Sequence, residues 1–101
     1  MKSFELFRFY HETLARKRDE LQAAYEEADD ADRLAWRIYE SLDREVYEAS
    51  PNHYDKIVEE TSERVKHLRE QLASIEDAIT HAKRLESELE FLEDDGVLPR
   101  D

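Results

Sequence analysis

Apolar residues recur every three or four positions through the second half of the chain. Their spacing alternates between three and four, with Glu86 in the one polar position of the series: Val58, Thr61, Val65, Leu68, Leu72, Ile75, Ile79, Ala82 and Leu89. This heptad spacing is typical of a helix that buries one face against another helix. It predicts a long helix over about residues 53–94.

The first half carries a second series with the same spacing: Phe7, Tyr10, Leu14, Lys17, Leu21, Ala24, Ala28, Ala31, Ala35, Ile38 and Leu42. The spacing does not change phase through the polar segment 29–32, so one helix is predicted over about residues 3–49. A break near Asp29–Asp32, which would give a three-helix bundle, is the alternative.

Ser50-Pro51-Asn52 is the strongest interruption between the two series. Ser50 is a favourable N-cap, and proline fits the first position of a helix while disfavouring helix in the residue before it. A turn is therefore predicted at Ser50–Asn52. Gly96 and Pro99 predict that the second helix ends near residue 94, leaving a short tail over 95–101. With 101 residues, we expect a single helical domain.

The two series mirror each other about Pro51 and Asn52. Pairing residues whose numbers add up to 103 places Lys17, the one charged member of the first series, opposite Glu86. This match predicts a coiled-coil-like antiparallel helical hairpin with Lys17 and Glu86 as a structural pair between its two arms.

Further apolar residues lie beside the first series and would remain uncovered in an isolated hairpin. Phe4, Tyr25, Tyr39 and Val46 share one heptad position, and Trp36 lies near them. Two outcomes remain open for this stripe: a core, either within the chain or in a homodimeric four-helix bundle, or a face that docks a different protein. Dimerisation into a four-helix bundle is the expected outcome.

Composition narrows the class of protein. One glycine and two prolines argue against a β-sandwich, a barrel or a glycine-rich nucleotide-binding fold. The absence of cysteine excludes disulfides and thiol chemistry. The net charge of −12 argues against direct nucleic-acid binding. No segment is apolar enough to cross a membrane and the N-terminus lacks a signal-peptide pattern, so a cytoplasmic location is expected.

Candidate catalytic chemistry is sparse. His53, His67 and His81 are fourteen residues apart along one helix face, too far apart to share a metal ion. No nucleophile motif, zinc motif or acidic calcium loop occurs in the sequence. We therefore expect no enzymatic activity and no cofactor.

Acidic runs supply the remaining candidate site. Five carboxylates between residues 26 and 32 form a candidate contact patch: Glu26, Glu27, Asp29, Asp30 and Asp32. The sequence favours a small acidic interaction module, such as an adaptor, assembly factor or regulator, that docks a protein partner or its own copy through a helix face. The alternative is an acidic inhibitor, of the kind encoded by phages, that mimics nucleic acid and occupies a basic nucleic-acid-binding surface of its target.

Overall fold

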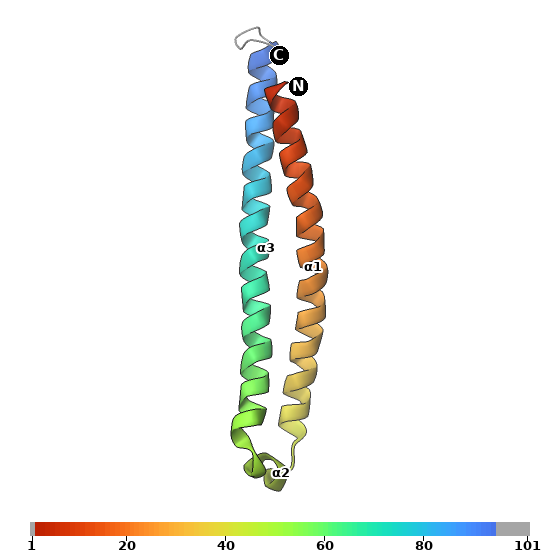
Figure 1. The fold of residues 1–101 in the computed structure, drawn as a ribbon, viewed down its shortest axis with the longest axis vertical. Helices are drawn as coiled ribbons and strands as arrows, with labels where there is room; N and C mark the ends of the chain where they lie inside the picture. Colours follow the sequence, from red (N-terminus) through yellow and green to blue (C-terminus); the bar gives the residue numbers. More distant parts are fainter. Residues whose placement is uncertain (1, 95–101) are drawn as a thin grey trace. The chain divides into compact units, whose positions relative to one another are not determined.

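Three α-helices and no strand make up residues 2–94, which are the residues that the computed structural model describes (Figure 1). Helix α1 spans Ser3–Ser41, α2 spans Arg44–Ala49, and α3 spans Pro51–Asp94. The predicted all-α class is confirmed. The predicted tail with Gly96 and Pro99 lies outside the described residues.

Helix α1 runs without a break through Asp29–Asp32, so the alternative with a third long helix is wrong. The predicted end near residue 49 is also wrong, because α1 stops at Ser41 and Asp43 adopts an extended backbone with φ −64° and ψ 145°. Neither glycine nor proline marks this point. The break turns α2 back, so that the Tyr47 hydroxyl reaches Asp55 on α3.

Helix α3 begins where the proline pattern predicted. Pro51 is its first residue, and the carbonyl of Ser50 accepts hydrogen bonds from the amides of His53 and Tyr54. Proline suits this position because its fixed φ is helical and the first amides of a helix have no helical acceptor. Of the turn predicted at Ser50–Asn52, only Ser50 lies between α2 and α3, because Pro51 and Asn52 already belong to α3. The longer connection between α1 and α3 also includes Leu42, Asp43 and α2.

The chain divides into two compact units, which are described separately. Unit 2 covers residues 21–71 and is an antiparallel helical hairpin: the second half of α1, then α2, then the first half of α3. In unit 1, residues 2–20 at the start of α1 lie beside residues 72–94 at the end of α3 (Figure 1).

The predicted buried face of α3 is confirmed. Val58, Val65, Leu72, Ile79 and Ala82 are the buried members of its heptad series, each at most 8% exposed. The remaining members, including Glu86, are half-buried. This face supplies most of the described core, because on α1 only Phe4 and Ala28 are equally buried.

The buried face of α1 differs from the prediction in one of its two heptad positions. The position of Phe7, Leu14 and Ala28 is buried or half-buried as expected. The second predicted position is largely exposed, as Tyr10 and Ile38 show. Its place is taken by residues that are buried or half-buried throughout: Phe4, His11, Arg18, Tyr25, Asp32 and Tyr39. Several of these residues are polar and bond to partners on α3, so the spacing of hydrophobic residues does not reveal that this position is buried.

The register between α1 and α3 also differs from the prediction. Four contacts join residues whose numbers add up to 94 instead of 103: Tyr39 with Asp55, Asp32 with Ser62, Tyr25 with Arg69, and Arg8 with Glu86. The reversal is therefore centred in α2 and not at Pro51. The hidden break at Leu42 and Asp43 accounts for the shift, because it converts the predicted end of the first arm into part of the connection.

The expected pairing of Lys17 with Glu86 is consequently wrong. Lys17 is exposed, and its Nζ lies 3.3 Å from Glu20 on the same helix. Glu86 instead accepts hydrogen bonds from Arg8 Nε, at 2.7 Å, and from His11 Nε2. Partial burial raises the pKa of the Glu86 carboxyl, but the hydrogen bonds from Arg8 and His11 outweigh that effect, so its pKa lies below the usual value.

This arrangement predicts an acid-sensitive contact in unit 1. Because the pKa of Glu86 is lowered by folding, its stabilising contribution is present above about pH 4.5 and is lost as the pH falls through the lowered pKa. We expect Glu86→Gln to lower the unfolding midpoint at neutral pH and to reduce the further loss between pH 5 and pH 3. Thermal unfolding followed by circular dichroism at several pH values measures both effects.

Glu88→Gln is the matched control, since the Glu88 side chain is 61% exposed and lies 4.0 Å from Arg84. An identical pH profile for the wild type and Glu86→Gln would show that the contact of Glu86 with Arg8 and His11 contributes no pH-dependent stability.

Candidate protein-binding groove

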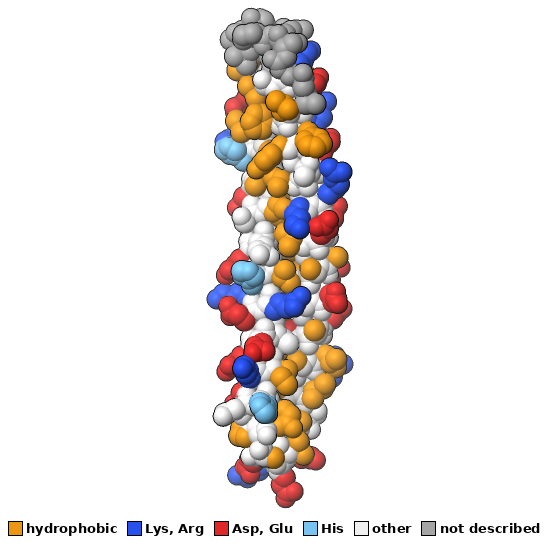
Figure 2. All heavy atoms as spheres, viewed as in Figure 1, with side chains coloured by type: hydrophobic (Ala, Val, Ile, Leu, Met, Phe, Trp, Pro, Cys, Tyr) orange, Lys and Arg blue, Asp and Glu red, His pale blue; other side chains and the backbone are white. Residues whose placement is uncertain are grey.

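An apolar groove of about 360 Å³ lies between α1 and α3 in unit 2. Its α1 side consists of Ala31, Leu34, Ala35, Ile38 and Tyr39, continued by Leu42. Its α3 side consists of Tyr54, Ile57, Val58 and Thr61. We call this hollow the unit 2 groove. Figure 2 shows hydrophobic side chains gathered over both helices at the end of the molecule that carries α2.

The groove exists because heptad positions beside the buried faces are also apolar. Ala31, Leu34 and Ile38 are spaced by three and four residues, so they lie on one face of α1. Leu34 and Ile38 on α1, and Ile57 on α3, remain 52%, 51% and 51% exposed. Thr61 is the one groove residue without an apolar side chain or ring. The surface therefore offers three large aliphatic side chains to a partner.

A tyrosine and aspartate cluster fixes the α2 end of this groove. Tyr39 Oη donates to Asp55 Oδ1 at 2.7 Å, and Tyr47 Oη donates to the same carboxylate at 2.9 Å. The hydrogen bond to Asp55 is the main cause that raises the pKa of the Tyr39 phenol far above its usual value. The rings of Tyr39 and Tyr47 meet edge to face, with centroids 5.7 Å apart. Asp55 thus connects α1, α2 and α3 within unit 2.

A second polar cluster is centred on Asp32. Its Oδ1 accepts hydrogen bonds from Thr61 Oγ1 at 2.7 Å and from Ser62 Oγ at 2.9 Å. Ser62 Oγ in turn accepts the indole N–H of Trp36 at 3.0 Å. These bonds fix the rotation of α1 relative to α3 in unit 2, because Asp32 and Trp36 must both face the same short segment of α3.

Three residues of the predicted aromatic stripe are buried or contact other residues of the same chain. Phe4 is buried, Tyr25 lies under the Arg69 guanidinium at 5.9 Å, and Tyr39 bonds Asp55. Val46 on α2 and Trp36 stay exposed, at 44% and 40%. The stripe is therefore not a continuous free face, and of its predicted partner residues only Trp36 and Val46 remain available.

The predicted acidic patch is also divided. Asp32 is occupied by Thr61 and Ser62, and Asp29 lies 3.0 Å from Arg33. Glu26, Glu27 and Asp30 are exposed. Glu27 lines a small hollow opposite Arg64, together with Ala24 and Ala31. Two of the five carboxylates are therefore engaged within the chain, and three are exposed.

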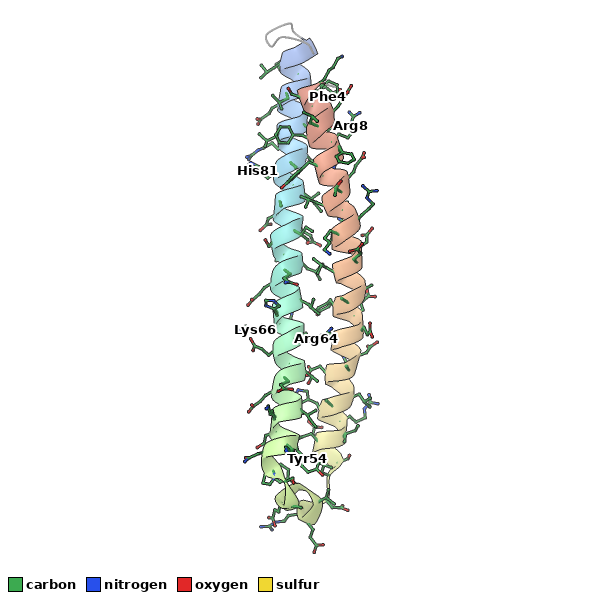
Figure 3. The ribbon with its side chains drawn as sticks, in the orientation of Figure 1. Phe4, Arg8, Tyr54, Arg64, Lys66 and His81 are labelled. Carbon is green, nitrogen blue, oxygen red and sulfur yellow. The ribbon has the colours of Figure 1, made fainter. Side chains whose placement is uncertain are left out.

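Unit 1 carries a smaller groove of about 240 Å³, lined by Phe7, Tyr10, Ala78, His81, Ala82 and Leu85. Its most exposed aromatic is Tyr10, at 53%. Figure 3 labels His81 on α3, and Phe4 and Arg8 on the first turns of α1. Each unit thus has an apolar groove between its α1 and α3 segments.

No group of three or more histidine, aspartate or glutamate side chains among residues 2–94 is arranged to hold a metal ion. None of the described helices is long and apolar enough to cross a membrane.

Comparisons with known proteins identify no relative from which a function could be proposed, so the proposed function depends on the structure. No protein-family model matches the chain, and neither the curated proteins nor the solved structures contain a significant match.

The sequence pattern did not reveal the groove as a site, although Ile57, Ala78 and Leu85 share one heptad position beside the buried face of α3. It assigned Ala31 and Ile38 to the buried face of α1, so they were not expected at the surface. The signal that would have identified the true face is the heptad position shared by His11 and Asp32, which is polar yet faces α3.

Proposed function

We propose that this chain is a non-enzymatic protein-interaction module that docks a helix face through the unit 2 groove. The observation that carries the proposal is the exposure of Leu34, Ile38 and Ile57, each about half open to solvent on two adjacent helices. The largest contiguous apolar patch on a soluble protein often marks the place where it binds a partner. An adaptor, assembly factor or regulator would use such a surface.

The shape of the groove suits an amphipathic helix. Residues 31–41 extend about 16 Å along α1, at a rise of about 1.5 Å per residue. A helix of about three turns, with apolar residues at spacings of three and four, would fill that length. Such a ligand would complete a three-helix or four-helix arrangement around the apolar side chains of unit 2.

Site-specific photo-crosslinking in the native cell tests the proposal. A photo-reactive residue at Ile38 should give a defined crosslinked product, because Ile38 lies in the groove. The same residue at Glu40, which is exposed on α1 and does not line the groove, is the matched control. Equal crosslinking at both positions, or none at Ile38, would contradict docking in the groove.

The salt dependence of binding distinguishes this proposal from the alternative of an acidic inhibitor. Apolar docking should persist between about 0.1 M and 0.5 M salt, because screening weakens charge contacts and not apolar burial. Mimicry of nucleic acid should lose most of its complex over that range. The crosslinked yield at Ile38 in cell extracts at both salt concentrations is the measurement, and a steep loss would favour the inhibitor.

A further inference from the structure

The apolar core of unit 2 is small for its length. Among residues 21–71, only Ala28, Val58 and Val65 are buried apolar residues. Domains of about 50 residues are marginally stable even when they bury an ordinary share of their surface. Further burial at the unit 2 groove would therefore add substantially to the core of this unit.

The uncovered area matches what one half of a stable interface requires. Leu34, Ile38 and Ile57 would each bury on the order of 100 Å², and the half-buried Leu42 and Tyr54 would add to this. Together they supply roughly the apolar half of the ~800 Å² that each partner contributes to a standard interface.

The repeat of the apolar heptad positions favours a second copy of this chain as the partner. Ile38 and Tyr10 on α1 are 28 residues apart, which is four heptads, and Ile57 and Ala78 on α3 are 21 apart, which is three. The grooves of units 1 and 2 thus use the same heptad positions of both helices. A partner that fits the unit 2 groove needs a pair of helices with matching heptad positions, and the same groove of a second copy offers them.

We propose that the unit 2 groove binds the corresponding groove of a second copy of this chain, forming a two-fold symmetric four-helix contact. This inference rests on the proposed docking function and names the partner. Leu34, Ile38 and Ile57 of one copy pack against the same three residues of the other. Such an isologous contact is the commonest way in which identical chains associate.

Sedimentation velocity from about 1 to 100 µM tests the inference. The wild type should be a dimer, and Ile38→Glu and Ile57→Glu should each weaken self-association at least tenfold by placing a carboxylate in the apolar contact. Val46→Glu is the control, because Val46 is similarly exposed at 44% and lies on α2 outside the groove. Circular dichroism of each variant verifies that its helices remain formed.

A single cysteine gives an independent readout, since the chain has none of its own. Under oxidation, Leu34→Cys or Ile38→Cys should form a disulfide-linked dimer, while Val46→Cys should not. A wild type that is monomeric at 100 µM overturns the inference. So does a dimer that Val46→Glu dissociates and the two groove variants leave intact.

The crosslinking experiment at Ile38 separates this inference from the proposed function. A product containing two copies of the chain supports both. A foreign protein crosslinked to a monomeric chain supports docking and overturns the second copy as the occupant. No specific product at Ile38 overturns both.

Discussion

Leu72→Ala should destabilise the protein by about 2–4 kcal/mol, the usual cost of removing a buried leucine side chain. Leu72 is 8% exposed and belongs to the α3 heptad series that supplies most of the described core. Because so few side chains are buried, the surrounding helices have few other apolar atoms with which to fill the cavity. Chemical denaturation followed by circular dichroism measures the loss.

Leu6→Ala is the matched control, since Leu6 is 53% exposed on α1 in the same unit. It should change the free energy of unfolding by less than about 0.5 kcal/mol, as surface substitutions usually do. Equal losses in the two variants would show that the α3 series is not the face on which unit 1 depends.

Asp32→Ala should destabilise unit 2 by about 1–3 kcal/mol, because two hydroxyls lose a shared charged acceptor. Thr61 Oγ1 and Ser62 Oγ both donate to Asp32 Oδ1, and Ser62 also accepts the Trp36 indole N–H. Asp32→Asn should recover part of the loss, since an amide oxygen can still accept these bonds. The change in Trp36 fluorescence on substitution reports whether the indole has moved.

Asp30→Ala controls for the loss of one negative charge from the same segment, because Asp30 is exposed on α1 two positions away. It should leave both the stability and the fluorescence of Trp36 nearly unchanged. If Asp30→Ala were as damaging as Asp32→Ala, the effect would be one of charge or helix propensity and not of the hydrogen bonds to α3.

The corrected face of α1 changes how the surface of this chain is interpreted. Tyr25 and Tyr39, expected to meet a partner, contact Arg69 and Asp55 of the same chain. Ile38, expected in the interior, stands half exposed beside Leu34. The proposed docking face therefore shares only Tyr39 with the predicted aromatic stripe, and it depends on aliphatic side chains more than on aromatic ones.

Local sequence alone determined the two long helices, apart from the end of α1, and the buried face of α3. Heptad spacing with almost no glycine or proline is sufficient to form long helices, and Pro51 specifies the start of α3 because its effect on the backbone is local. The series from Val58 to Leu89 identified the buried face of α3 because nearly every member is apolar, so the hydrophobicity pattern and the buried face coincide.

Tertiary contacts decided which face of α1 is buried, the register between α1 and α3, and the position of the unit 2 groove. His11 and Asp32 face α3 because Glu86, Thr61 and Ser62 satisfy their polar atoms, and a single-helix pattern cannot show such partners. The break at Leu42 and Asp43 carries no breaker residue and allows Tyr47 to reach Asp55 across the turn. That break moved the reversal of the chain into α2. Together with the changed buried face of α1, it left Ile38 and Ile57 lining the same open groove. This arrangement depends on hydrogen bonds between residues distant in sequence, which the pattern of neither helix specifies alone.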